Sequence, residues 1–381
     1  MKREHLIIIF IMIGMMVYFL LGHPVMMDDG FHYEGFAEAL ANGKLDFKSF
    51  YGFQGLSFFA ALIFWLTNSP VSIIITSAIF SVLSVPLAYF IGEEFYKSSR
   101  AGIYFLILFL LTPYPYTTMM RGFQESALLF FVLLIIYGSI NKKVWTPVSW
   151  AIGGIVKPFA LVLLPLFLKD FLMPDSKSNT SRVAKIVWAL LAVAIGGAYL
   201  GVSYYQTGHL VNNAAINSYQ GNFDPNGPHP LVESFTVGIK GYLRIGANLL
   251  LYFRKIMISP LVIFLGAFSL FLNGGLRLRK EITVSIILNL LLVGSLTFSF
   301  SKYLLPMTTL FALASISYAL KYKWLMILIL IDSLTVFIPI WSYFGNHFWP
   351  NIYIYLIPLY LAIILFVYDH LFTKHNFNTN S

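Results

Sequence analysis

The chain has no cysteine among its 381 residues, which excludes disulfide bridges, thiol nucleophiles and cysteine-ligated zinc sites. Charge is also scarce, because 11% of the residues are Asp, Glu, Lys or Arg, whereas soluble proteins average about 25%. In contrast, 58% of the residues are hydrophobic. Apolar windows of roughly 18–20 residues, long enough to cross a bilayer, recur along the chain. The composition therefore predicts an all-α polytopic membrane protein.

Acidic residues are fewer than basic ones, and the formal net charge is +9. We attribute this excess to basic cytoplasmic loops and expect no nucleic-acid partner. The loops rich in lysine and arginine are centred on 97–100, 142–143, 169–185, 277–280 and 321–323. Placing all of them in the cytoplasm predicts about 12 transmembrane helices (range 10–13) with cytoplasmic termini, in a plasma or inner membrane.

That placement depends on residues 55–67. As a helix this segment would measure only about 20 Å, less than the roughly 30 Å of a hydrocarbon core. We therefore expect an interfacial or re-entrant helix there, and we expect the first apolar helix to be retained rather than cleaved. The predicted spans are 6–22, 70–92, 101–112, 122–140, 145–157, 158–172, 184–205, 251–273, 282–300, 303–320, 324–343 and 350–369. The whole chain, 1–381, is expected to form one membrane domain with a first half, 1–172, and a more variable second half, 173–381.

Three segments then lie on the non-cytoplasmic side, namely 23–69, 113–121 and 206–250. The last is polar and rich in Asn, Pro and Gly, which predicts a long loop. The first holds a predicted surface helix over about 30–41, preceded by two adjacent acids that are good helix caps.

Those acids, Asp28 and Asp29, directly follow the first apolar helix. Acidic side chains at a membrane surface are costly to place. One alternative is that they only cap the helix. The other is that one caps while its neighbour, which points in a different direction, acts as a general base toward an incoming hydroxyl. Glu34 and Glu38 share a helical face, and we expect both to be solvated.

Glu125 is predicted to open the helix after the second outer segment, where the helix dipole favours an anion. Arg121 lies four residues earlier and is a candidate ion-pair partner. In the functional alternative, Glu125 faces Asp28 across a site, where it binds a metal or orients the acceptor.

Two lysines are predicted at the same outer interface. Lys157, followed by Pro158, lies about 21 Å along a helix from Lys143, and Lys302 begins a late span. One alternative is that each lysine only anchors its helix by reaching toward water. The other is that the helix end at Pro158 opens space for a phosphate beside Lys157, and that Lys302 holds a phosphate and stabilises the charge that grows on it when a bond to it breaks. Asp332 lies deep in a span, and we expect it to make a helix–helix polar contact rather than to take part in catalysis.

These elements, in this order, resemble the membrane glycosyltransferases of the GT-C superfamily, and within it the branch of protein O-mannosyltransferases and lipid A aminoarabinose transferases. That branch has an acidic pair leading into a surface helix, an aromatic segment with Gly or Pro, an acid that opens a helix, a Thr-Lys-Gly-Pro turn and a late Arg-Tyr-Leu-Leu-Pro motif. The corresponding residues here are Asp28–Tyr33, Tyr51–Gly55, Glu125, Val156–Pro158 and Lys302–Pro306. The turn Val156–Pro158 lacks the glycine of the branch. Lys302 stands where the branch has arginine, so a point charge replaces a bidentate grip on phosphate.

The resemblance implies sugar transfer from a polyprenyl- or dolichyl-phosphate carrier to an acceptor hydroxyl on the non-cytoplasmic face, with inversion. Asp28 would be the general base, and Asp29 and Glu125 would orient the base or the acceptor. Substrate and phosphate contacts are expected from Arg121, Lys157, Lys302, Tyr303, His32 and Tyr33. No cofactor is expected; a divalent cation, if one is used, would bind Asp28, Asp29 and Glu125. The acceptor is a lipid, a glycan or a protein, and membrane lipids are further partners.

Two other functions stay open as alternatives. A transporter or flippase of lipid-linked sugars would share the spans and the phosphate chemistry, although transporters usually place polar residues near the bilayer midplane. A glycan polymerase would use charged outer loops, and Lys240 and Arg244 in the 206–250 segment keep that alternative open.

Overall fold

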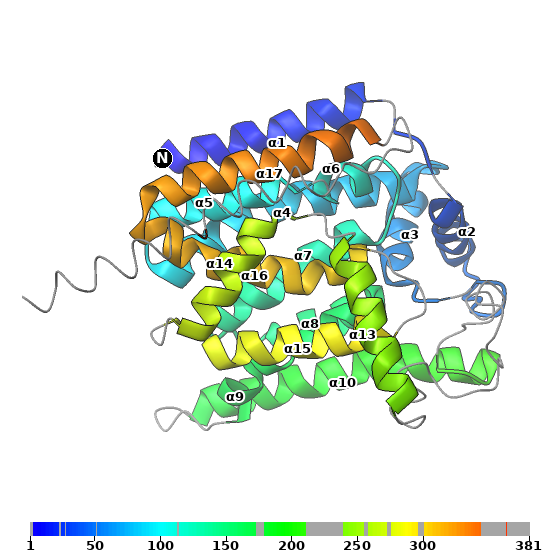
Figure 1. Cartoon of the computed structure of the whole chain (residues 1–381). Helices are drawn as coiled ribbons and strands as arrows, with labels where there is room; N and C mark the ends of the chain where they lie inside the picture. Colours follow the sequence, from blue (N-terminus) through cyan, green and yellow to red (C-terminus); the bar gives the residue numbers. More distant parts are fainter. Residues whose placement is uncertain are drawn as a thin grey trace, which may run out of the picture.

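The computed structural model describes residues 3–22, 24–26, 28–50, 52–112, 114–172, 179–210, 239–254, 258–272, 276–295, 301–343 and 363. Within these ranges all regular structure is helical, which confirms the predicted class (Figure 1). In chain order the elements are α1 (Arg3–Leu21), α2 (Asp28–Ala41), α3 (Gly55–Thr67), α4 (Ser72–Tyr96), α5 (Ser99–Leu110), α6 (Tyr114–Met119), α7 (Glu125–Ile140), α8 (Thr146–Val156), η1 (Pro158–Leu163), α9 (Pro165–Leu172), α10 (Asn179–Thr207), α13 (Ile239–Arg254), α14 (Pro260–Leu272), α15 (Arg279–Ser295), η2 (Ser301–Leu304), α16 (Leu305–Lys321) and α17 (Lys323–Tyr343).

The chain is an integral membrane protein. Among the described helices, those long and apolar enough to cross a bilayer are Glu4–Leu21, Ser72–Tyr96 and Arg182–Thr207. Shorter apolar helices, namely α3, α5, α7, α8 and α14, accompany them. Large apolar side chains on α1 and α10 face outward, such as Phe10 and Val193, each 71% exposed. So large an exposed apolar surface is favourable in contact with lipid and unfavourable in contact with water. The number of spans stays a prediction, and the last of them, 350–369, falls almost wholly outside the described residues.

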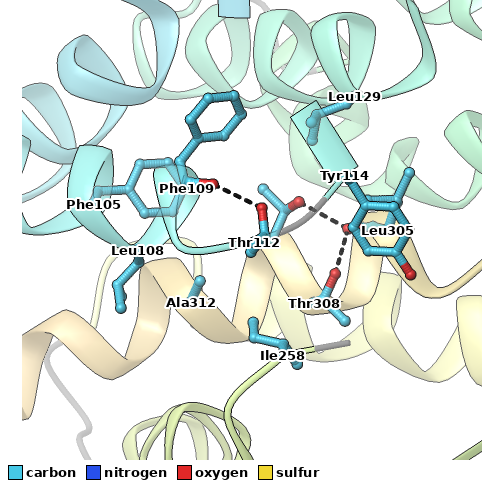
Figure 2. A pocket seen from close by; sticks show the side chains of 11 residues that line it. Phe105, Leu108, Phe109, Thr112, Tyr114, Leu129, Ile258, Leu305, Thr308 and Ala312 are labelled. Carbon is cyan, nitrogen blue, oxygen red and sulfur yellow. Dashed lines mark hydrogen bonds between the residues drawn. The ribbon is translucent and has the colours of Figure 1, made fainter. Parts of the chain in front are cut away.

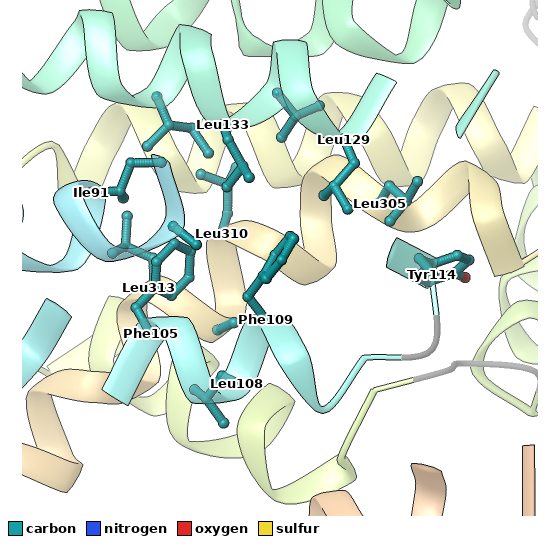
Figure 3. Packing of buried hydrophobic residues seen from close by; sticks show 14 of the residues in the cluster. Ile91, Phe105, Leu108, Phe109, Tyr114, Leu129, Leu133, Leu305, Leu310 and Leu313 are labelled. Carbon is teal, nitrogen blue, oxygen red and sulfur yellow. The ribbon is translucent and has the colours of Figure 1, made fainter. Parts of the chain in front are cut away.

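Helix α4 runs through the middle of the bundle and packs against α1, α3, α5 and α7. Small residues let its neighbours come close: a side chain at Gly92 would meet the main-chain oxygen of Ala101 in α5 at 2.5 Å. Figure 3 shows apolar side chains from α4, α5, α7 and α16 meeting in this core, among them Ile91, Phe105 and Leu310. Close packing of this kind holds a membrane bundle together, because lipid supplies no hydrophobic driving force between helices.

Many of the helices run nearly parallel, so the bundle has two ends (Figure 1). At one end the Arg277 guanidinium donates to the main-chain oxygens of Glu94 and Ile140, near the C-termini of α4 and α7. We call this the basic end, because basic residues flank the helix termini there: Lys97, Arg100, Lys142, Lys143, Lys185, Arg277, Arg279, Lys280, Lys321 and Lys323. The opposite end carries the starts of α4 and α7. This separation of charge fits the predicted cytoplasmic loops, although the sidedness itself stays a prediction.

Helices α2 and α3 lie at the opposite end. The side chain of Gln54, directly before α3, lies with its Nε2 3.1 Å from His32 Nε2 in α2. Ser72, at the start of α4 and just after α3, donates from Oγ to Glu34 of α2 at 2.8 Å. The residues directly before α3 and shortly after it therefore both reach the same short stretch of α2, so the chain enters and leaves α3 at one end of the bundle. The interfacial or re-entrant placement of 55–67 stays a prediction, with which this arrangement is compatible.

The prediction that Glu34 is solvated is wrong. Its side chain is 7% exposed, and its carboxylate accepts hydrogen bonds from the N–H of Ser72 at 3.2 Å and from the N–H of Ile73 at 2.6 Å, besides the Ser72 hydroxyl. A carboxylate from α2 thus caps α4, where the first N–H groups have no partner within the helix and the dipole favours an anion. Glu38, its predicted companion, is exposed as expected.

The segment 206–250, predicted to be one long loop, contains most of helix α13. Asn248 Nδ2 donates to the main-chain oxygen of Gly294 in α15 at 2.9 Å. A side chain at Gly294 would meet Ile245 at 2.8 Å, so the glycine permits close contact between α13 and α15. The prediction failed because the lysine, arginine and asparagine residues of this amphipathic helix were read together with the polar stretch before it. Residues 211–238 of the predicted loop lie outside the described residues.

Candidate functional site

A buried ion pair lies at the end of the bundle opposite the basic end. Glu125 is the first residue of α7, and its Oε1 pairs with Lys157 Nζ. The side chains of Glu125 and Lys157 are 2% and 13% exposed, respectively. Two charges withdrawn from water in this way are costly unless they serve each other or a ligand. The sequence suggested Arg121 as the partner of Glu125, whereas the ion pair in the structure is made by Lys157.

Lys157 lies at a bend between α8 and η1. A proline disfavours helical conformation in the residue before it, and Lys157, before Pro158, is extended with φ −155° and ψ 137°. Helix α8 and the η1–α9 segment therefore form a hairpin with Lys157 at its tip. Helix α3 packs tightly on this tip, since a side chain at Gly55 would meet the main chain of Val156 at 2.5 Å. The packing fixes the position from which the ammonium group projects.

Two aromatic rings complete the surroundings of Lys157. Its Nζ lies 5.4 Å from the ring centroid of Tyr303, within the range of a cation–π interaction. Tyr303 in turn stacks on Phe159, with a centroid distance of 4.6 Å and an interplanar angle of 18°. Asn289 Nδ2 donates to the main-chain oxygen of Tyr303 at 3.3 Å. The ammonium group is thus held between a carboxylate and an aromatic face contributed by different elements.

Asp28 and Lys302 are placed by their main chains, because their side chains lie outside the described part of the structure. Asp28 is the first residue of α2, so the helix begins about two residues before the predicted start, and Asp28 and Asp29 lie in its first turn rather than before it. Lys302 belongs to η2 and directly precedes Tyr303, so its main chain lies beside the tip that carries Lys157.

The first turn of α2 packs on the loop before α7. A side chain at Gly30 would meet the main-chain oxygen of Arg121 at 2.8 Å. Asp29 and Arg121 are both half-buried at this contact. Burial lowers the pKa of the Arg121 guanidinium from its ordinary value, since it penalises the charged form. The structure thus brings the start of α2 to the loop that leads directly into Glu125.

His32 and Tyr33 lie one turn further along α2. Their rings meet edge-on with centroids 5.8 Å apart, and the His32 ring lies 5.2 Å from that of Phe50. Both side chains are half-buried, and these ring contacts do not involve Glu125 or Lys157. They line the α2 side of the same end of the bundle.

Two glutamines that sequence reasoning did not single out connect these parts. Gln54 is fully buried; its N–H donates to the Tyr199 hydroxyl in α10 at 2.9 Å, and its side chain meets His32. Gln124, next to Glu125 and 1% exposed, donates from Nε2 to the main-chain oxygen of Phe53. Buried amides need such partners. Both glutamines follow a phenylalanine and directly precede a helix, and that shared position was the available signal.

A metal site gains no direct support. Among the residues with described side chains, no three His, Asp or Glu groups gather as a metal ion would need. The predicted cation ligands are Asp28, Asp29 and Glu125, and the side chain of Asp28 lies outside the described part of the structure, so metal independence stays a prediction.

Asp332 behaves as predicted, because it makes a polar contact between helices. It is fully buried and accepts hydrogen bonds from Ser259 Oγ and, at 3.0 Å, from the N–H of Leu261. Its carboxylate thus caps α14.

A small cavity lies between the end of α5, the start of α6 and the start of α16, near η2 (Figure 2). Its volume of about 30 Å³ suits about one water molecule. The hydroxyls of Thr308 and Thr309 are both directed to the main-chain oxygen of Leu305, at 3.1 and 2.8 Å, so the walls are largely apolar. A polyprenyl chain does not fit in this cavity.

No family model matches this chain, and no curated protein matches it in sequence. Its fold is similar to that of ArnT from Cupriavidus metallidurans in the apo state, at 9% identity and a TM-score of 0.54 over 91% of this chain and 66% of ArnT. The structure of ArnT bound to undecaprenyl phosphate matches at 10% identity and a TM-score of 0.55, over 87% of this chain and 63% of ArnT. The chain thus spans about two thirds of the length of ArnT. ArnT is a lipid A aminoarabinose transferase of the GT-C type, so the resemblance predicted from the motifs is confirmed at the level of the fold.

Proposed function

We propose that this protein is a glycosyltransferase that moves a sugar from a polyprenyl- or dolichyl-phosphate carrier to an acceptor hydroxyl. The observation that carries the proposal is the buried Glu125–Lys157 pair beside Tyr303, opposite the basic end of an ArnT-like fold. That ArnT has been seen with undecaprenyl phosphate supports a polyprenyl-phosphate donor here.

In this proposal Lys157 binds the phosphate of the donor. An ammonium group has three N–H donors, so Lys157 can bridge the Glu125 carboxylate and a phosphate oxygen. The cation is held by its neighbours before the reaction, and it sits where water is scarce. A fixed charge in such a place stabilises negative charge that develops on the leaving phosphate more strongly than the same charge in water.

The transfer step involves one proton and one bond exchange. Asp28 accepts the proton of the acceptor hydroxyl, and the oxygen attacks the anomeric carbon of the sugar. The bond from that carbon to the phosphate oxygen breaks, and the carrier phosphate leaves with the electron pair. Attack from the face opposite the leaving group inverts the anomeric configuration.

The remaining predicted site residues have supporting roles in the proposal. Asp29 and Glu125 orient the base or the acceptor. Arg121 and Lys302 balance the charge of the phosphate, while Tyr303, His32 and Tyr33 contact the substrate. The main-chain contact between Gly30 and Arg121 supports the placement of the acidic pair near the loop before α7. We expect no metal ion to be needed.

The reaction is assigned to the non-cytoplasmic face, because the Glu125–Lys157 pair lies opposite the basic end and basic loops are retained in the cytoplasm. The same geometry favours transfer over transport. Transporters place their polar residues near the bilayer midplane, whereas the polar groups here gather at one end, and the deep residue Asp332 is engaged in capping α14.

The test is sugar transfer in reconstituted liposomes with a panel of polyprenyl-phosphate sugars. Wild type is compared with Asp28→Asn and with Glu38→Gln, a control for an exposed carboxylate on the same helix. We expect turnover by wild type and the control, and collapse in Asp28→Asn while donor still binds. Movement of labelled lipid across the bilayer without turnover of any donor would instead identify a flippase.

A further inference from the structure

Asn289 interrupts the apolar sequence of α15, and its side chain is fully buried. It shares the buried face of this helix with Ile282, Ile286 and Val293. Helix α15 packs on both η1 and η2, the two short segments that contribute the aromatic rings beside Lys157. A polar side chain inside a membrane bundle is unfavourable unless it makes a contact or serves a function. The position of Asn289 therefore connects a buried amide with the donor site.

The two polar atoms of this amide are used unequally. Nδ2 donates to the main-chain oxygen of Tyr303 at 3.3 Å, and because the acceptor is a carbonyl, the nitrogen rather than the oxygen must face it. Oδ1 is buried and has no hydrogen-bond donor among the residues that the structure describes. A buried acceptor without a donor lowers stability, and an apolar side chain of the same shape avoids that loss. Packing alone would therefore favour leucine at position 289.

The bond to Tyr303 links Asn289 to the ammonium group of Lys157. Tyr303 lies in η2, a 3₁₀ turn of four residues, so a bond to its main-chain oxygen limits where its ring can lie. That ring stacks on Phe159 and lies with its centroid 5.4 Å from Lys157 Nζ. Loss of the bond would free the ring, and the ammonium group would then be held on the carboxylate side alone.

We propose that Asn289 is a positioning residue, which holds the Tyr303 ring over Lys157 and thereby fixes the ammonium group that binds the carrier phosphate. The role of that phosphate rests on the proposed function. The link from Asn289 to Lys157 rests on the contacts alone, so it can be tested without sugar transfer.

The experiment measures how fast Lys157 is acetylated by dilute acetic anhydride in the purified full-length protein, read from its peptide by mass spectrometry. The test variants are Asn289→Leu, which nearly keeps the shape of the side chain, and Asn289→Ala, which adds no volume at a buried position. The matched control is Asn248→Leu, because Asn248 Nδ2 also donates to a main-chain oxygen, that of Gly294, at 2.9 Å. Thermal unfolding and sugar transfer are measured on the same samples.

We expect Lys157 to be acetylated at least about threefold faster in both Asn289 variants than in wild type, as the loss of a cation–π contact allows. In the transfer assay kcat should fall about tenfold, with KM within about twofold of wild type. The unfolding midpoint of Asn289→Leu should be no lower than that of wild type, because the buried acceptor is gone. Asn248→Leu should keep the wild-type acetylation rate and kcat. Asn289→Leu should have no further effect when added to Tyr303→Leu, because the contact through which it acts is already lost.

A wild-type acetylation rate of Lys157 in both Asn289 variants would overturn the proposal. An equal increase in Asn248→Leu would also overturn it, as would a further increase when Asn289→Leu is added to Tyr303→Leu, since either result indicates general loosening of the bundle. If wild type transferred no sugar from any donor, the proposed function would fail instead, and the acetylation rates would still decide whether Asn289 acts on Lys157.

Discussion

The Glu125–Lys157 pair allows a quantitative test of the site geometry through a double-mutant cycle. Removing one partner of a buried pair costs about 3–5 kcal/mol, because the other charge is left without compensation. The Lys157 side chain is 13% exposed, so it recovers some hydration, and we expect Glu125→Gln to cost about 3 kcal/mol, near the lower limit. Lys157→Met should cost a similar amount, since Glu125 is 2% exposed.

The double variant removes both charges together and should cost no more than either single one. That outcome corresponds to a coupling of about 3 kcal/mol between the two side chains. The free energies of unfolding are measured by titrating the detergent-solubilised protein with a denaturing detergent and following tryptophan fluorescence. The pair Glu94 and Lys97, whose side chains are 36% and 70% exposed, supplies the control cycle, with an expected coupling below about 1 kcal/mol. Additive effects at Glu125 and Lys157 would refute the burial and pairing argued for this site.

Three further outcomes are expected. Lys157→Gln should lower kcat for sugar transfer on the order of 100-fold, with partial recovery in Lys157→Arg; a change in KM alone would contradict its role at the leaving phosphate. Glu34→Gln should lower the free energy of unfolding by about 1–2 kcal/mol, because the charge-assisted bonds to the start of α4 weaken, while Glu38→Gln should change it by less than about 0.5 kcal/mol; equal effects would argue against the cap. Gly92→Val should lower the free energy of unfolding by about 1–3 kcal/mol or more, because the added side chain pushes α4 away from α5. Gly14→Val should leave it nearly unchanged in the same unfolding titration, because a side chain at Gly14 would meet nothing within 4 Å.

Local patterns in the sequence were sufficient to predict individual helices. The predicted spans 70–92 and 122–140 correspond to α4 and α7, which cover Ser72–Tyr96 and Glu125–Ile140, because apolar runs bounded by polar residues mark membrane helices directly. The helix predicted over about 30–41 also formed. Helix α13 was missed because its charged and polar residues continue the polar stretch before it, and its contact with Gly294 of α15 shows which side is buried.

Contacts between distant parts of the chain were harder to predict. Glu125 was placed correctly at a helix start, but its partner Lys157 is 32 residues away and meets it only because the α8 hairpin packs on α7. The nearby Arg121 was the partner that sequence spacing favoured. Glu34 was assigned to a solvated face for a similar reason: its cap of α4 depends on how α2 lies over the bundle, which no short-range pattern encodes.

The cap that Glu34 provides has a consequence for how the chain enters a membrane. Ser72 and Ile73 are fully buried, and in lipid their N–H groups would be expensive to leave without acceptors. Glu34 precedes them in the chain, so the carboxylate that accepts these N–H groups is synthesised before the helix that needs it. The first turn of the central helix therefore depends on a group from a separate and earlier helix, and α2 and α4 must come together before that turn can be fully bonded in an apolar environment.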